Sequence, residues 1–160
     1  MKEKTLDSES GIEISAVRQN TFANLNGHAV IFELLQNGMF HLKQAIQQHD
    51  TAAHIKEKLR DLFESAFKCL ALFCKENESN QKLLSERMKL FLTNLDLEIG
   101  QIELVCEICR DNKYICETYG NYIIDCVLEA IENNGRRAIY LEPLIVRIPH
   151  HPSNHFCFNN

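Results

Sequence analysis

The stretch that decides the fold is TAAHIKEKLRDLFESAFKCLALFCKEN, residues 51–77. Its apolar side chains recur at steps of three and four residues, which is the spacing of one face of an α-helix. The members of this face are Leu59, Leu62, Phe63, Ala66, Leu70 and Phe73. Asp50 or Thr51 is the expected N-cap, because a short polar side chain can accept a hydrogen bond from a free amide. The pattern predicts a long amphipathic helix that ends at a polar corner.

The polar corner, KENESNQK at residues 75–82, separates this helix from a second one. Ser79 or Asn80 is its expected N-cap. Asn and Gln side chains can satisfy the free backbone groups where one helix ends and the next begins. We interpret Asn77, Asn80 and Gln81 as structural residues, with Gln81 long enough to tie two corners together; a partner-binding corner is the alternative. The second helix has the apolar positions Leu84, Met88, Phe91, Leu92 and Leu95.

Helical spacing also occurs on both sides of this central pair. Residues 22–38 predict a helix that stops at Asn37-Gly38, followed by a shorter helix or connector to residue 49. After the central pair, Asp111-Asn112 is expected to interrupt a third apolar segment. This segment contains Ile99, Ile102, Val105, Cys106 and Cys109.

The last third of the chain predicts three more helical pieces. A short one passes through Tyr114 and Cys116 and ends at Gly120-Asn121. The next, residues 122–135, is expected to be buried on two sides and to end at Asn134-Gly135. A final helix contains Pro143, which should break or kink it.

These segments predict an all-α fold, an armadillo-like stack of antiparallel helix hairpins of the α-solenoid kind. No fixed sequence period of a repeat protein is visible. We expect a flexible tail at residues 1–17, a helical domain at 18–148 and a disordered tail at 149–160.

Composition limits the possible partners. The 160 residues are 45% hydrophobic and 24% charged, which is ordinary for one soluble domain. A net charge of −5 leaves no basic field for nucleic acid or an anionic membrane. The longest apolar run, Cys69–Cys74, is far shorter than the ~20 residues that cross a bilayer. We therefore expect no nucleic-acid partner and no membrane insertion by this segment.

No pattern for catalysis is present in the sequence. The six glycines are isolated, so they build neither a phosphate-binding loop nor a dinucleotide fingerprint. No motif pairs a nucleophile with an activating base. The sequence thus predicts a non-enzymatic domain without a cofactor and without a small-molecule pocket.

The cysteines offer one metal-binding alternative. Cys106 and Cys109 lie one helical turn apart, and Cys116 and Cys126 follow at distances that a zinc site tolerates. Both thiols of the first pair fall mid-helix on an apolar face, so we interpret all four as core residues and keep zinc as the alternative. The C-terminal stretch with three histidines and Cys157 has no helical pattern to hold a metal.

Two further groups stand out. His28 sits in an apolar helix pattern and is expected to be a core histidine with one local hydrogen bond. Arg136 and Arg137 follow a predicted helix end, where they could bind an anion, although solvated arginines are commoner in turns.

Four stretches carry a family resemblance: NLNGHAVIFELLQ (24–36), FKCLALFCKENESNQKLLSERMKLFL (67–92), EICRDNKYICE (107–117) and VLEAIENNGRRAIYL (127–141). In order and spacing they resemble the central helical domain of inositol trisphosphate receptors. This is the RIH domain (ryanodine and inositol trisphosphate receptor homology), which ryanodine receptors share. The resemblance covers Arg18 to Ile148.

The resemblance implies a place in the cytosolic part of a homotetrameric calcium-release channel, on the cytosolic face of the endoplasmic reticulum membrane. There the domain would transmit ligand-driven movement toward the pore, with neighbouring domains of the same channel as partners. No ligand-binding or gating residue of the family matches this chain. The structural residues that carry over are Asn77, Asn80 and Gln81 at the corner, and Gly135, Arg136, Tyr140 and Leu141 at the later turn.

The chain also departs from the family pattern. The family's helix after Tyr140-Leu141 continues, whereas here Pro143 enters it. We therefore expect a fragment whose last dozen residues are not native to the domain. The leading interpretation is a helical relay segment of a calcium-release channel, and the alternative is a free-standing helical scaffold that binds other proteins.

Overall fold

The computed structural model describes residues 6–48 and 50–146, and every regular element in these ranges is helical. The elements are α1 (Leu6–Asn24), α2 (Gly27–Gln47), α3 (Ala53–Cys74), α4 (Glu78–Ser85), α5 (Met88–Phe91), η1 (Leu95–Leu97), α6 (Gln101–Cys109), α7 (Lys113–Asn134), η2 (Ala138–Leu141) and α8 (Glu142–Val146). The predicted all-α fold class is confirmed.

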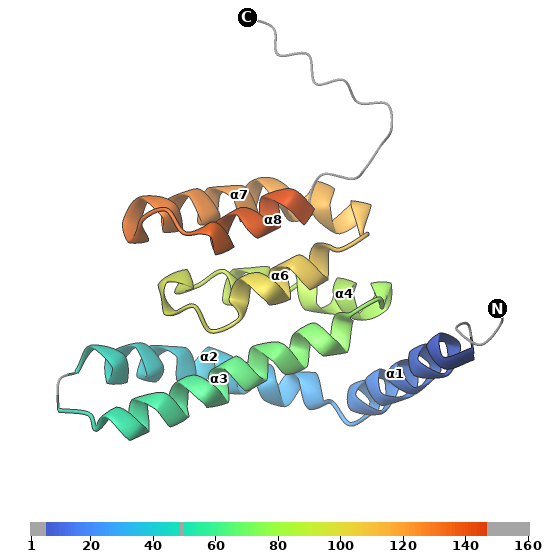
Figure 1. The fold of residues 1–160 in the computed structure, drawn as a ribbon, viewed down its shortest axis with the longest axis horizontal. Coiled ribbons are helices and arrows are strands. Elements are labelled where there is room, and N and C mark those ends of the chain that lie inside the picture. Colours follow the sequence, from blue (N-terminus) through green and yellow to red (C-terminus); the bar gives the residue numbers. More distant parts are fainter. Residues whose placement is uncertain (1–5, 49, 147–160) are drawn as a thin grey trace, which may run out of the picture.

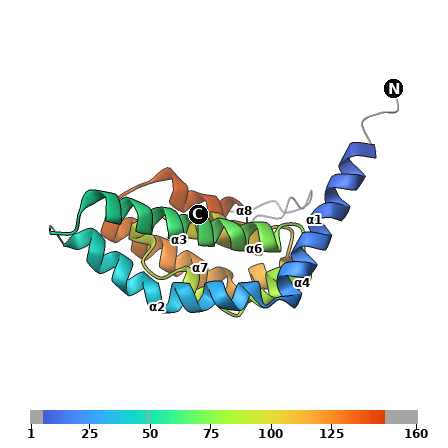
Figure 2. The same ribbon diagram turned by 90° about the horizontal axis from the view of Figure 1, so that it is seen from below.

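The helices stack in layers (Figure 1). The antiparallel pair α2 and α3 forms one end of the stack, and α7 with α8 forms the other. The middle layer contains α4, α5 and α6, with α3 packed on one side of α6 and α8 on the other. Helix α1 projects from the start of α2, away from the other layers (Figure 2). The arrangement is a short stack of helix pairs with an added N-terminal helix.

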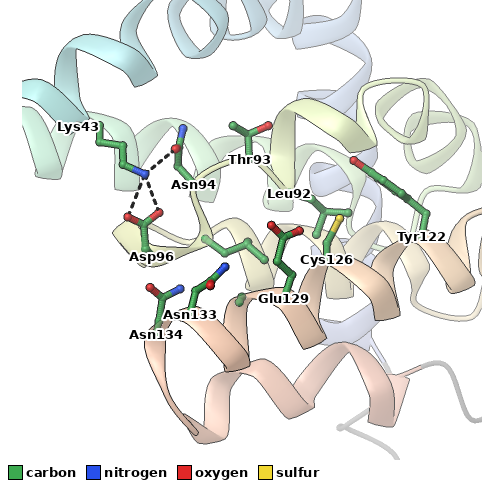
Figure 3. A pocket seen from close by; sticks show the side chains of 12 residues that line it. Lys43, Leu92, Thr93, Asn94, Asp96, Tyr122, Cys126, Glu129, Asn133 and Asn134 are labelled. Atoms are coloured by element: carbon green, nitrogen blue, oxygen red, sulfur yellow. Dashed lines mark hydrogen bonds and ion pairs between the residues drawn. The ribbon is translucent and has the colours of Figure 1, made fainter.

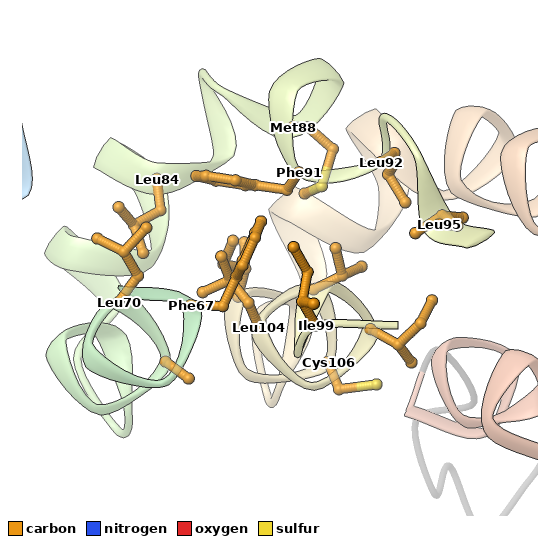
Figure 4. Packing of buried hydrophobic residues seen from close by; sticks show 14 of the residues in the cluster. Phe67, Leu70, Leu84, Met88, Phe91, Leu92, Leu95, Ile99, Leu104 and Cys106 are labelled. Carbon is orange, nitrogen blue, oxygen red and sulfur yellow. The ribbon is translucent and has the colours of Figure 1, made fainter. Parts of the chain in front are cut away.

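One apolar core runs through the layers. Phe67 of α3 and Phe91 of α5 are fully buried and pack edge-to-face, with 6.4 Å between ring centroids. Figure 4 shows them beside Leu70, Leu84 and Leu104. Burial of each such side chain contributes about 1.5–3 kcal/mol. These contacts join α3, α4, α5 and α6 into one unit. Most of the predicted apolar face of α3 is buried, but Leu62 is 47% exposed, so its predicted place on that face is wrong.

Helix α2 continues through the predicted stop at Asn37-Gly38, so that prediction is wrong. A Cβ atom on Gly38 would lie 2.5 Å from Cζ of Phe63 on α3. The glycine therefore lets the two helices approach closely and does not end the helix. The actual break is at Asn26, which has φ 54° in the left-handed region.

Helix α7 is also longer than predicted, because it continues through Gly120-Asn121 without a break. Two-sided burial is wrong as well: Val127 is fully buried, but Leu128 is 49% exposed. The predicted end is correct, since Gly135 follows the helix at φ 84°. Pro143 lies in the first turn of α8, where proline is tolerated, and the predicted single helix is split into η2 and α8.

The second helix of the central pair is divided into α4, α5 and η1, although its predicted apolar residues are all buried. The chain turns at Asn94 and Glu98, whose φ angles are 56° and 50°. The Gln101 side chain holds this turn, because its Oε1 accepts from Ile99 N at 2.8 Å and its Nε2 donates to Asn94 O at 2.9 Å. The spacing thus predicted the buried residues but not the turns between them.

The N-terminal part of the chain differs from the predicted flexible tail. Residues 1–17 were expected to be a flexible tail, but α1 is helical from Leu6. This helix contacts the stack through Gln19, Phe22 and Ala23, near its C-terminal end, so little of its sequence carries a core-facing pattern. The predicted C-terminal tail lies outside the described residues, and the boundaries at 18 and 148 stay predictions.

The N-cap position of α3 is Ala52, without a side-chain cap, so the prediction of Asp50 or Thr51 is wrong. Within residues 6–48 and 50–146, none of the helices combines the length and apolar character needed to cross a bilayer.

Candidate functional site: two polar corners

The predicted polar residues meet at the connection between α3 and α4. Lys75–Asn77 is called corner A. Helix α3 ends because Glu76 adopts the left-handed conformation, with φ 54°. Asn77, and not Ser79 or Asn80, is the N-cap of α4: its Oδ1 accepts from Asn80 N at 3.1 Å. The Asn80 side chain instead donates to Phe73 O at 2.8 Å and so satisfies a carbonyl at the end of α3.

The connection between α6 and α7 has the same construction. Arg110–Asn112 is called corner B. Asp111 is left-handed at φ 55°, and Asn112 is the N-cap of α7, with its Oδ1 accepting from Ile115 N at 3.2 Å. The backbone matches as well: Asn112 N donates to Cys109 O at 3.2 Å, and Asn77 N donates to Cys74 O at 3.1 Å. The two corners are copies of one local structure.

A glutamine side chain closes each corner. At corner B, Nε2 of Gln81 donates to Glu107 O and to Arg110 O, both at 3.0 Å. Its Oε1 accepts from Nδ2 of Asn112 at 3.0 Å. This one side chain therefore satisfies two carbonyls at the end of α6 and the amide of the α7 N-cap.

Gln19 of α1 does the same at corner A. Its Nε2 donates to Leu72 O at 3.0 Å and to Lys75 O at 2.9 Å, and its Oε1 accepts from Nδ2 of Asn77 at 2.9 Å. Gln19 and Gln81 are 7% and 4% exposed. Gln19 comes from α1 and closes the corner after α3, whereas Gln81 comes from α4 and closes the corner after α6.

These contacts form a ladder of hydrogen bonds on one edge of the molecule. Both corners lie on the edge from which α1 projects (Figure 1). Starting from Gln19, the bonds reach corner A and the start of α4; Gln81 on α4 then reaches corner B and the start of α7. We call this set of contacts the corner ladder. It connects α1, the central layers and α7 without using the apolar core.

The sequence contains a short signal for the ladder. Phe73-Cys74-Lys75-Glu76-Asn77 recurs 35 positions later as Ile108-Cys109-Arg110-Asp111-Asn112. Each position is matched in chemistry, but five residues are too few to stand out as a repeat. Gln19 was missed altogether, since it lies at the edge of the predicted tail.

The four residues predicted as structural at the turn after α7, Gly135, Arg136, Tyr140 and Leu141, lie in different surroundings. Gly135 N donates to Ile131 O at 3.0 Å and ends α7. Tyr140 is fully buried, with its hydroxyl 3.5 Å from Leu95 O, and burial raises its pKa. Arg136 and Leu141 are exposed. The ion pair at this turn is made by Arg137, with Glu98, so the turn packs through Tyr140 and is held at its surface by the next arginine.

The cysteines are arranged as core residues. Cys106 and Cys109 are both 5% exposed, and the Cys116 thiol donates to Cys109 O at 3.3 Å. Burial raises the pKa of Cys74 and of Cys106 to about 12, which suppresses the thiolate that binds metals. In the described ranges no three His, Cys, Asp or Glu side chains are grouped to hold a metal ion.

His28 packs among aromatic rings. Its imidazole stacks on Phe73, with ring centroids 5.6 Å apart and planes at 3°, and meets Phe32 edge-on at 5.7 Å. Its Nδ1 is buried and has no hydrogen-bond partner among the described residues, so the expected local bond is absent there. Its role in the described structure is packing at the α2–α3 contact.

The structure also contains a polar groove, where the sequence predicted no pocket. It has a volume of about 320 Å³ and lies between α7, the loop after α5 and Lys43 of α2 (Figure 3). Lys43 Nζ lies 3.2 Å from the Asp96 carboxylate and donates to Asn94 Oδ1 at 3.0 Å. The groove and the corner ladder are separate features.

A family model described as the RIH domain matches residues 1–146. The match includes both polar corners, the whole of α1 and the turn after α7. No solved structure matches the chain.

Proposed function

Because the chain belongs to the RIH domain family, the homology domain of ryanodine and inositol trisphosphate receptors, we propose that it is a relay segment of an intracellular ligand-gated calcium-release channel. In this proposal the parent is a homotetramer of the inositol trisphosphate receptor kind. The segment lies on the cytosolic face of the endoplasmic reticulum membrane. It has no catalytic role and passes conformational change between the ligand-binding and pore regions.

The observation that carries the relay proposal is the corner ladder. Hydrogen-bond networks and rigid helices are among the elements that carry coupling between distant sites in a protein. Gln19 and Gln81 each bind the end of one helix and the start of the next. Buried amides with all these bonds made are costly to displace, since each group left unsatisfied loses about 1–3 kcal/mol. The two corners therefore resist opening.

The ends of the stack support contact with neighbouring domains. At one end Ile55 and Leu62 lie two turns apart on one face of α3, and they are 45% and 47% exposed. At the other end Leu128, Leu141 and Ile145 are 49%, 50% and 67% exposed. Further helical layers of a parent solenoid would cover such side chains, because each repeat buries the apolar face of its neighbour.

The same exposed residues favour a second candidate function, a free-standing scaffold that binds other proteins. The two functions differ in what the corner ladder does. A scaffold needs the ladder for stability alone, whereas a relay also needs it for coupling between its two ends.

A chimeric channel tests the relay. An inositol trisphosphate receptor would carry this chain in place of its own RIH segment, and ligand-triggered calcium release from microsomes would be measured. We expect release to be retained in the chimera and to be reduced by Gln81→Ala at unchanged ligand binding. Loss of release in the unmodified chimera, with folded and ligand-binding protein, would favour the scaffold. Equal release with and without Gln81→Ala would contradict the role of the ladder.

A further inference from the structure

The polar groove beside α7 has a wall of one helix face. Its lining from α7 includes Tyr122, Cys126, Glu129, Ala130 and Asn133, which recur at steps of three and four residues. The opposite wall is the loop that carries Leu92 to Asp96. In Figure 3 the Glu129 carboxylate points from α7 toward Leu92 and Thr93 of this loop. The groove is thus lined mainly by polar groups, because Leu92 and Ala130 are each only 6% exposed.

The charges in the groove are unbalanced. Lys43 is the only cation among the lining residues, and it is already bound to Asp96 and Asn94. Glu129 makes no ion pair within the described part of the chain. The Glu129 carboxylate therefore lines the groove without a positively charged partner among the described residues. An entering cation would bind it without displacing an existing partner.

The other polar groups fit a peptide backbone. Asn133 makes no side-chain hydrogen bond to another described residue, and Asn94 uses only its Oδ1, for Lys43. A side-chain amide has both a donor and an acceptor, as a peptide unit does. Asn94 and Asn133 therefore offer donors and acceptors to a peptide unit in the groove.

We propose that this groove binds an extended basic segment of a partner protein, with one lysine or arginine side chain directed to Glu129. The neighbouring peptide units pair with Asn94 and Asn133. A volume of about 320 Å³ is at the lower end for ligand pockets, which suits one long side chain rather than a nucleotide or lipid. The proposed site does not depend on the relay function.

An NMR titration of the complete 160-residue chain tests the site. The probe is the blocked peptide Gly-Ser-Arg-Gly-Ser, and its control has citrulline, which is neutral and of the same shape, in place of arginine. We expect amide shifts centred on Thr93, Asn94, Glu129 and Asn133. The citrulline peptide should bind about two- to fivefold more weakly, because an ion pair with an exposed carboxylate such as Glu129 is weak.

Two charge-neutralising variants separate specific binding from general attraction to an acidic protein. Glu129→Gln should weaken binding of the arginine peptide to a similar extent, about two- to fivefold. Glu132→Gln is the matched control, because Glu132 is exposed on the same helix and does not line the groove. It should leave the affinity unchanged. Equal weakening by both variants, or shifts spread away from the groove, would overturn the proposal.

Discussion

Replacement of Gln81 by alanine is the most direct perturbation of the corner ladder. The variant loses two bonds from Nε2, to Glu107 O and Arg110 O, and one bond to Oε1 from Asn112. At about 1 kcal/mol net for each bond, the free energy of unfolding should fall by about 3 kcal/mol. For a chain of this length that corresponds to a melting temperature lower by about 6–12 °C.

Urea unfolding followed by circular dichroism at 222 nm measures this loss. Gln36→Ala is the control, since Gln36 is exposed on α2 and should stay within about 0.5 kcal/mol of the parent. A double-mutant cycle with Asn112→Ala isolates the bond between the two side chains, and we expect a coupling of about 0.5–3 kcal/mol. A loss for Gln81→Ala below about 1 kcal/mol, or no coupling to Asn112, would refute the reasoning.

Three further predictions concern packing, backbone and thiols. Gly38→Ala should destabilise the chain by about 1 kcal/mol or more, because the added Cβ would lie 2.5 Å from Phe63 Cζ and this overpacking outweighs the better helix propensity of alanine. Chemical denaturation measures the loss of stability. In a Phe63→Leu background, Gly38→Ala should no longer cause it. Gly135→Ala should cost about 1–3 kcal/mol from backbone strain alone, since φ is 84° and no atom lies within 4 Å of the added Cβ; an unchanged denaturation midpoint would contradict this. The pKa of Cys74 and of Cys106 is raised from 9.0 to about 12, so iodoacetamide at pH 8 should modify these thiols about a thousandfold more slowly in the folded than in the unfolded chain. Because the unfolded thiols release protons that the folded thiols keep, the free energy of unfolding should also fall as the pH rises from 9.0 to about 12, and a midpoint independent of pH in that range would be inconsistent with the shift.

Much of the core could be predicted from the sequence, because burial follows local spacing. Phe63, Leu70 and Val127 were expected inside and are at most 3% exposed. The helix ends were harder to predict, since a glycine has two uses. Gly135 ends a helix through its backbone conformation, whereas Gly38 lies within one and makes room for Phe63. Only the position of the neighbouring helix distinguishes the two.

The polar corner was predicted in part. Asn77, Asn80 and Gln81 could be selected because Asn and Gln are common where helices end. Their individual partners could not, because Gln81 bonds to carbonyls 26 and 29 positions away and Gln19 to carbonyls 53 and 56 positions away. Such contacts depend on how the layers stack. The polar groove was missed for the same reason, since its walls come from segments far apart in the chain.

Both corners place a carboxylate residue, Glu76 or Asp111, in the left-handed conformation that glycine adopts more easily. A glycine there would act as a swivel, because it can leave that conformation for many others of similar energy. For a residue with a side chain the left-handed region is small, so each joint keeps a narrow range of angles while the carbonyls on either side stay bonded. Bending of the stack is therefore opposed at both corners, where the backbone angle and the glutamine hydrogen bonds act together.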